Sequence, residues 1–187
     1  MANHFLVTAP LVEPVTVDEV KLYTRVYHDV EDTLIAQWIK SGRKLAEEYQ
    51  HRSYIEQTWG MNLDSFPCSY IEIPRPPLMS VESIKYYDVD NVEYTVDSND
   101  YYVDVTSAVG RISLNNGVSW PFISLRPING VVITFVAGYG DTDDVPDQCK
   151  DAIYLYCAYR FENRTAEAGT IPKAFFDILT PDRKAVY

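Results

Sequence analysis

The amino-acid sequence predicts an α+β protein in which a helical core carries an inserted antiparallel β section. Helical periodicity is confined to the two ends of the chain, whereas the middle contains short β-branched and aromatic runs separated by turn residues. The core is expected to comprise a helix hairpin, a long third helix and a short C-terminal helix. We expect a single domain over 1–187, with the helical core at 15–51 and 144–180, the β section at 52–140 and a C-terminal tail at 181–187.

The first two helices are predicted from capping residues and apolar spacing. Thr16 and Glu19 form a capping box, and Val15 and Val20 stand where a hydrophobic staple would. The first helix is expected over about 17–27, burying Val20, Val26 and either Leu22 or Tyr23. Asp29 is expected to cap a second helix that continues to about Gln50, with Gly42 weakening it without ending it.

The β section is predicted from seven short runs, each bounded by Gly, Pro, Asn or Asp. An extended arm at 1–14 precedes the helices, because Pro10 and Pro14 oppose a helix. The loop at 115–127 separates the last two strands. Short, evenly spaced strands indicate an antiparallel sheet or a small barrel. The expected strands lie at 53–63, 70–73, 81–87, 92–96, 101–105, 111–114 and 131–137.

The third helix is expected over 147–164, where Pro146 suits the first turn. Its apolar residues cover most of its circumference, which is typical of a helix buried on several sides. Two interpretations stay open: a helix that contacts neighbouring subunits, and a central helix within one domain. On the first, the subunit-interface candidates are Trp38, Tyr154, Tyr156, Tyr159 and Phe161. A short fourth helix is expected at 171–179.

The composition restricts the classes of function. The net charge of −11 and the pI near 4.6 argue against a protein that grips phosphate backbones, because that affinity comes mainly from Lys and Arg. The charge suits a surface that DNA passes without sticking, and simple solubility explains it equally well. The fifteen tyrosines suit both interfaces and half-buried strands.

The cysteines indicate a reducing compartment. Cys149 and Cys157 are eight positions apart on one expected helix, a rise of about 12 Å, which is too far for a disulfide. Cys68 stands alone near a turn, and there is no CxxC pair. We find neither a signal peptide nor an apolar stretch long enough for a membrane span. The sequence therefore predicts a protein made in a cytoplasm.

The sequence predicts no enzyme, no cofactor and no metal site. The three histidines lack metal-ligand spacing, and no nucleophile elbow, phosphate-binding loop or zinc motif is present. Asp141, Asp143 and Asp144 precede Pro146 and Ala152 where a calcium loop needs Gly and Glu, so a solvated acidic loop is expected instead. A second group of aspartates is interpreted as turn residues near strand ends: Asp88, Asp90, Asp97, Asp100 and Asp104.

Several motifs, in this order, resemble the head–tail connector (head-completion adaptor) family of tailed bacteriophages and prophages. The matching stretches cover nearly the whole chain, and their joint order is more specific than any one of them. They are Val12-Glu13-Pro14-Val15-Thr16-Val17-Asp18-Glu19-Val20-Lys21, Glu31-Asp32-Thr33-Leu34-Ile35, Ala46-Glu47-Glu48-Tyr49, Ile73-Pro74-Arg75-Pro76-Pro77-Leu78-Met79-Ser80-Val81, Gly110-Arg111-Ile112, Ile133-Thr134-Phe135-Val136-Ala137-Gly138-Tyr139-Gly140-Asp141, Val145-Pro146 and Phe161-Glu162-Asn163-Arg164.

This resemblance implies a structural virion protein located in the neck, assembled in the cytoplasm of a bacterial host. Members of the family form a ring beneath the portal, twelve-fold like the portal itself. The ring extends the DNA channel and joins the capsid to the next neck or tail protein. The resemblance also implies that the C-terminal segment docks onto a partner, although Pro181-Asp182-Arg183 departs from the more aromatic ending of the family. The docking candidates are Asp182, Arg183, Lys184, Val186 and Tyr187.

Two other classes of protein are alternatives. A small β-domain that binds carbohydrate, carried on a helical base, would use Trp59, Trp120 and Tyr101 or Tyr102 as exposed stacking residues. A hydrolase that uses a pair of aspartates would bring two carboxylates together in a pocket. The first alternative predicts a monomer with an aromatic cleft, whereas the connector predicts an assembling subunit.

Overall fold

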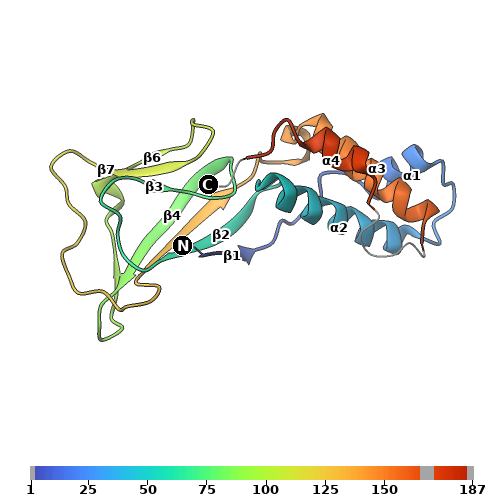
Figure 1. The fold of residues 1–187 in the computed structure, drawn as a ribbon. Coiled ribbons are helices and arrows are strands. Elements are labelled where there is room, and N and C mark those ends of the chain that lie inside the picture. The colour runs from blue at the N-terminus through green and yellow to red at the C-terminus, as the bar shows by residue number, and fades with distance from the viewer. Residues whose placement is uncertain (1–2, 165–170, 185–187) are drawn as a thin grey trace. The chain divides into compact units, whose positions relative to one another are not determined.

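The computed structural model describes residues 3–164 and 171–184, which fold into two compact units (Figure 1). The β unit consists of Met1–Pro10 and Glu56–Gly138, and the helical unit consists of Leu11–Ile55 and Tyr139–Tyr187. The described chain contains four α-helices and antiparallel sheets, so the predicted α+β class is confirmed.

The helical unit contains all four described helices. A capping box begins the first helix, in which the Thr16 hydroxyl accepts from the Glu19 N–H at 3.2 Å and the Glu19 carboxylate accepts from the Thr16 N–H at 2.7 Å. A short 3₁₀ turn, η2 (Thr142–Asp144), precedes the third helix. The helices are α1 (Val17–Thr24), α2 (Asp32–Gln50), α3 (Asp147–Glu162) and α4 (Lys173–Leu179).

The long third helix, α3, is central to the helical unit. It contacts α1, α2 and α4, and all five of its fully buried residues join the same apolar core. Gly42 of α2 permits a close approach of α3, because a Cβ at this position would lie 2.9 Å from the Tyr156 ring. The surrounding helices therefore cover part of the apolar circumference of α3, and Tyr154, Tyr159 and Phe161 stay partly exposed.

The first helix ends earlier than the sequence predicts. The expected helix continued to Tyr27, but α1 stops at Thr24 because Arg25 adopts a left-handed backbone (φ 57°) and donates its N–H to the carbonyls of Leu22 and Lys21. Either Leu22 or Tyr23 was expected in the core. Both are instead exposed, and the buried positions are Val20 and Val26.

The second helix begins at Asp32, without the cap expected from Asp29. The Asp29 carboxylate instead accepts from the Lys21 ammonium at 2.5 Å. That ammonium also pairs with Asp32 at 3.0 Å, in the first turn of α2. Asp29 therefore forms an ion pair with Lys21 of α1 in place of the predicted hydrogen bond to the N-terminal end of α2.

The β unit contains two antiparallel sheets. The larger has the strand order β1-β2-β8-β4-β5 and the smaller has the order β3-β7-β6. The expected hairpin between residues 81 and 96 is formed by β4 and β5. The strands are β1 (Asn3–Thr8), β2 (Gln57–Leu63), β3 (Ile71–Glu72), β4 (Leu78–Tyr87), β5 (Glu93–Thr95), β6 (Tyr101–Asp104), β7 (Arg111–Leu114) and β8 (Val131–Ala137), with a 3₁₀ turn, η1 (Ser98–Asp100), before β6.

Strand β8 lies in the middle of the larger sheet and supplies the core of the β unit. Its burial alternates along the strand, and Val131, Ile133, Phe135 and Ala137 are all 0% exposed. Alternate residues of a strand point to opposite faces, so these four share one face. Ile84 of β4 and Ile112 of β7 join the same core.

The N-terminal arm is a strand of the larger sheet. The sequence predicted only an extended conformation there, whereas β1 pairs with β2 from Asn3 opposite Asn62 to Thr8 opposite Thr58. Gly60 makes room for the arm, because a Cβ at that position would lie 2.4 Å from the Phe5 ring. The β unit is therefore built from two separate stretches of sequence.

We expect Phe135→Ala to destabilise the β unit by about 3–5 kcal/mol, because it removes a fully buried ring and leaves a cavity in the core. Phe122→Ala is the matched control, since the Phe122 side chain is fully exposed, and its effect should stay below about 0.5 kcal/mol. Urea unfolding followed by tyrosine and tryptophan fluorescence measures both. Equal effects of the two substitutions would contradict this assignment of the core.

Candidate assembly interface

The five aromatic residues predicted at a subunit interface divide into two groups. Trp38 and Tyr156 lie in the core of the helical unit, with 6% and 8% of their surface exposed. Tyr156 packs against Gly42 and against the Phe175 ring of α4. These two side chains therefore stabilise the unit itself and offer little surface to another subunit.

The other three aromatic candidates keep part of their surface exposed. The Tyr154 ring stacks on Tyr23 of α1 at 5.4 Å between centroids, and the Phe161 ring meets Trp38 edge-on at 6.3 Å. Tyr159 is also partly exposed on α3. Tyr154, Tyr159 and Phe161 consequently remain candidates for contact with a neighbouring chain.

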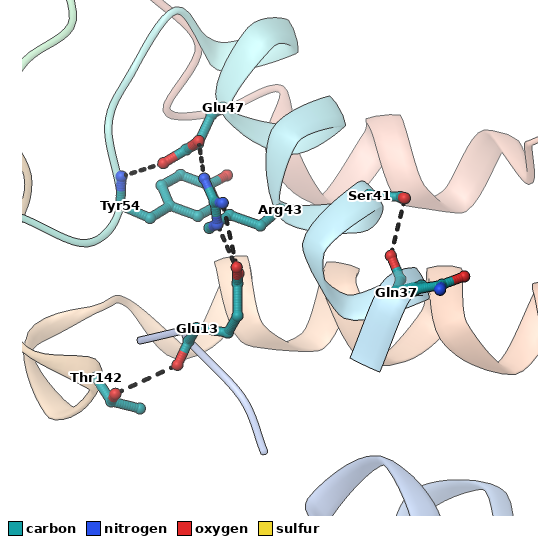
Figure 2. Close-up of polar contacts among 7 residues, drawn as sticks. All are labelled: Glu13, Gln37, Ser41, Arg43, Glu47, Tyr54 and Thr142. Atoms are coloured by element: carbon teal, nitrogen blue, oxygen red, sulfur yellow. Dashed lines mark hydrogen bonds and ion pairs between the residues drawn. The ribbon is translucent and has the colours of Figure 1, made fainter. Parts of the chain in front are cut away.

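A buried arginine joins three parts of the helical unit (Figure 2). The Arg43 guanidinium, on α2, donates to both carboxylate oxygens of Glu13 at 2.6 and 3.2 Å, and to Glu47 one turn along α2 at 2.6 Å. The other Glu47 oxygen accepts from the Tyr54 N–H at 2.8 Å. The Thr142 hydroxyl donates to the Glu13 carbonyl at 3.4 Å. The stretch before α1 is thereby fixed to α2 and to the turn before α3.

The network contains one cation and two carboxylates, and the contacts among them explain why these charges tolerate burial. Arg43 is 2% exposed and Glu47 is 5% exposed. Burial on its own would lower the pKa of Arg43, but the hydrogen bonds and charges of Glu13 and Glu47 outweigh it and raise that pKa. The guanidinium stays protonated, and its planar fork makes the two-pronged contact with Glu13 that a lysine could not make.

A second buried polar group lies near the end of α2. The Gln50 side-chain amide donates to the Leu179 carbonyl of α4 at 2.8 Å, and its oxygen accepts from the Tyr54 hydroxyl at 2.6 Å. Burial raises the pKa of Tyr54, so the hydroxyl remains a donor. This contact holds the C-terminal helix against α2.

The described part of the predicted docking segment lies along the end of α2. The Arg52 side chain donates to the Asp182 carbonyl at 2.8 Å, and the Lys184 N–H donates to the Gln50 carbonyl at 3.1 Å. The Arg183 guanidinium lies 4.6 Å from the centre of the Tyr49 ring. Val186 and Tyr187, the other two docking candidates, lie outside the described residues.

The sequence did not predict an exposed apolar surface that lies on α1 and on the loop after it. Leu22, Tyr23, Tyr27 and Val30 are 80%, 53%, 89% and 90% exposed, and we name these four side chains the apolar loop surface. The sequence predicted that either Leu22 or Tyr23 would be buried, but both are exposed on α1.

The residues proposed for carbohydrate binding do not form an aromatic cleft. The Trp59 ring lies 4.9 Å from the Arg75 guanidinium, and the Trp120 ring stacks on Phe66 at 4.6 Å. Tyr101 is buried, and of these residues only Tyr102 is largely exposed. The prediction of an exposed stacking platform made of these residues is therefore not supported.

Asp104 is the carboxylate whose surroundings bear most directly on the alternative of a hydrolase. The Asp104 carboxylate accepts from Ser107 at 2.6 Å and from Arg111 at 2.7 Å, which holds its pKa well below the usual range. A carboxyl group that stays ionised is a poor general acid near neutral pH. Within 3–164 and 171–184, no three His, Cys, Asp or Glu side chains are arranged to hold a metal ion. No helix of that part is long and apolar enough to cross a membrane.

Comparison with known proteins gives a likeness of fold. No family model matches the chain, and no curated protein sequence matches it. Three solved chains share its architecture along almost their whole length. One, from "Neck of empty GTA particle computed with C6 symmetry", has a TM-score of 0.81 and 22% identity, covering 100% of this chain and 97% of the other.

Two further similar chains also come from gene transfer agent particles. A chain from "Virion of native gene transfer agent (GTA) particle" gives the same TM-score of 0.81, identity of 22% and coverage of 100% and 97%. A chain from "Neck of native GTA particle computed with C12 symmetry" has a TM-score of 0.74 and 19% identity, with 98% and 97% of the two chains covered. The chain therefore has the fold of these particle proteins, with both its units included.

We expect Arg43→Met to destabilise the protein by about 3–5 kcal/mol, because it leaves two carboxylates near a buried position without their cation. Lys44→Met, at the next and exposed position of α2, is the control and should change stability by less than about 0.5 kcal/mol. Chemical denaturation measures both. Adding Glu13→Gln and Glu47→Gln to Arg43→Met should recover part of the loss, and no recovery would contradict the ionic explanation.

We expect one of the three cysteines to react with a thiol reagent in the native protein. Burial raises the pKa of Cys149, and that of Cys157 to about 12, whereas Cys68 is exposed. The thiolate is the reactive form, so the two buried thiols should be inert near pH 8. Titration with a chromogenic disulfide should give one thiol in buffer and three in denaturant. Rapid reaction of all three in buffer would contradict the burial of α3.

Proposed function

We propose that this chain is a structural protein of the neck of a tailed, phage-like particle, where it acts as a head–tail adaptor. Copies of it would form a ring, twelve-fold like the portal above it, that extends the DNA channel and connects the capsid to the next neck or tail protein. In this role the protein has no catalytic activity. It would assemble in the cytoplasm of the bacterial host and remain in the virion.

The observation that carries this proposal is the extent of the fold likeness. The alignment with the chains of gene transfer agent necks includes all or nearly all of this chain and 97% of theirs, so both compact units are matched rather than one common motif. Two of those necks were computed with C6 and C12 symmetry, as expected of ring assemblies. The order of motifs in the sequence points to the same class of protein independently.

The surface of the molecule supports a role beside DNA. The formal net charge is −11, and the five aspartates around the start of α3 are exposed: Asp141, Asp143, Asp144, Asp147 and Asp151. An acidic channel wall would let DNA pass with little adhesion, because affinity for the phosphate backbone requires cations. The proposed contact with DNA is therefore passage and not recognition.

The C-terminal segment is the proposed docking element for the portal or the neck partner. Asp182, Arg183 and Lys184 end the described part of the chain, where they lie along α2. Val186 and Tyr187 extend this segment. A short segment of this kind that rearranges on contact would make assembly sequential, since the subunit would complete its binding surface only on its partner.

The decisive measurement is the native mass of the protein by light scattering over a range of concentrations, with and without the portal of the same particle. We expect ring-sized particles, or recruitment to the portal, for the intact chain. Deletion of 181–187 should abolish recruitment while leaving the thermal unfolding temperature nearly unchanged, because the fully buried residues of α4 are retained.

The control for this deletion is Lys173→Ala, which changes an exposed residue of α4 away from the segment and should leave recruitment unchanged. A chain that is monomeric at every concentration and also ignores the portal would overturn the adaptor function. Recruitment that persists after the deletion would keep the adaptor function and remove the docking role of the C-terminal segment.

A further inference from the structure

Helix α4 is fixed in the core of the helical unit up to its last residue. Phe175 and Leu179 are both 0% exposed, and the buried Gln50 amide donates to the Leu179 carbonyl at 2.8 Å. Pro181 stands two positions after Leu179 and opposes continuation of the helix, because proline has no N–H to donate. The chain after α4 is therefore a separate segment, which need not move together with the helix.

Residues 181–184 lie against the end of α2 through main-chain contacts. An α-helix leaves its last carbonyls without partners inside the helix. The Gln50 carbonyl, the last of α2, accepts from the Lys184 N–H at 3.1 Å. The Arg52 guanidinium donates to the Asp182 carbonyl at 2.8 Å. Both bonds are made to the backbone of the segment, so they fix its course and leave the Asp182 side chain at the surface.

Tyr49, in the last turn of α2, contacts both α4 and the segment after it. Its hydroxyl lies 2.9 Å from the Thr180 hydroxyl, and its ring packs against the Phe176 ring at 5.0 Å between centroids. The guanidinium of Arg183, an exposed residue, lies 4.6 Å from the centre of the Tyr49 ring. A cation over an aromatic ring is weakly attracted at an exposed site. Tyr49 therefore positions the segment without binding it tightly.

Release of the segment costs little at Arg52. The hydrogen bond from Arg52 to the Asp182 carbonyl is exposed to solvent, so water can replace either partner. The Arg52 guanidinium also lies 3.5 Å from the Tyr139 hydroxyl, and this contact does not involve the segment. Exposed hydrogen bonds near a chain end open locally without unfolding of the whole domain. The segment can thus detach while α4 stays in the core.

We propose that the end of α2 is a latch, formed by Tyr49, Gln50 and Arg52, which holds 181–184 against its own subunit, and that the portal competes with this latch for the docking segment. This inference rests on the proposed function. The main-chain groups that the latch occupies become available to the portal only when the latch opens. A binding-competent form that is only fractionally populated lowers the apparent affinity in proportion. The latch therefore restrains docking by the isolated subunit.

The first test is hydrogen exchange of the chain without any partner, followed by NMR. Arg52→Gln removes the guanidinium that holds the segment and should lower the protection of the Lys184 amide by about threefold to tenfold. The amides of Phe175 and Leu179 should keep their protection, since α4 stays in the core. Lys40→Gln, at an exposed position of α2, is the matched control. Equal protection of the Lys184 amide in Arg52→Gln and in the intact chain would show that Arg52 is not part of a latch.

The second test measures affinity for the portal of the same particle, for which a latch and a docking contact predict opposite results. If Arg52 restrains the segment, Arg52→Gln populates the open form and should tighten binding by about threefold to tenfold. If Arg52 belongs to the docking surface, the same substitution weakens binding, as deletion of 181–187 does. Lys40→Gln should bind like the intact chain. Weaker or unchanged binding by Arg52→Gln would overturn the competition.

The outcomes separate the latch from the function on which it rests. If deletion of 181–187 abolishes recruitment and Arg52→Gln does not tighten it, the adaptor function stands and the latch is wrong. If the intact chain and Arg52→Gln both ignore the portal, the adaptor function fails and the competition fails with it. Lower protection of the Lys184 amide together with tighter binding of the portal supports both.

Discussion

The ion pairs of Arg43 are the constraint on which the helical unit depends. One buried guanidinium joins the stretch before α1, the middle of α2 and, through Glu47 and the Tyr54 N–H, the stretch that leaves α2. These three segments are held by a cation that has two carboxylate partners and little access to water. Such a network adds little net stability over an apolar core, but its geometry admits few alternatives. Its main effect is to fix where the N-terminal stretch lies.

That position determines which apolar residues face outward. With Glu13 held by Arg43, Val15 enters the core and Leu11 is left at the surface. At the start of α2, the ion pair of Lys21 and Asp29 likewise holds the loop before the helix, and Tyr27 is left in solvent. In both places, polar contacts inside the unit decide which apolar side chains are exposed.

The sequence predicted most elements of the fold because their signals are local. The alternation in β8, the capping box at Thr16 and the Pro before α3 are each visible in a few residues.

The β1 strand was missed as part of a sheet because its partner, β2, lies some fifty residues away and is joined to it only by pairing. The early end of α1 was missed because Arg25 carries no sequence signal for a left-handed backbone. An apolar pattern does not reveal which sides of a helix other helices cover, so Trp38 of α2 and Tyr156 of α3 were among the interface candidates, and both lie in the core of the helical unit.

The two stretches that form the β unit affect how the chain can be divided. The backbone passes between the units after Pro10, Ile55 and Gly138, so three covalent connections join them. A hybrid gene that exchanges 56–138 alone would therefore leave β1 without its own β2, and Phe5 would face a foreign residue where Gly60 stood. Exchange of the β unit between relatives requires both stretches to be inherited together. This links the first ten codons to a region that begins much further along the gene.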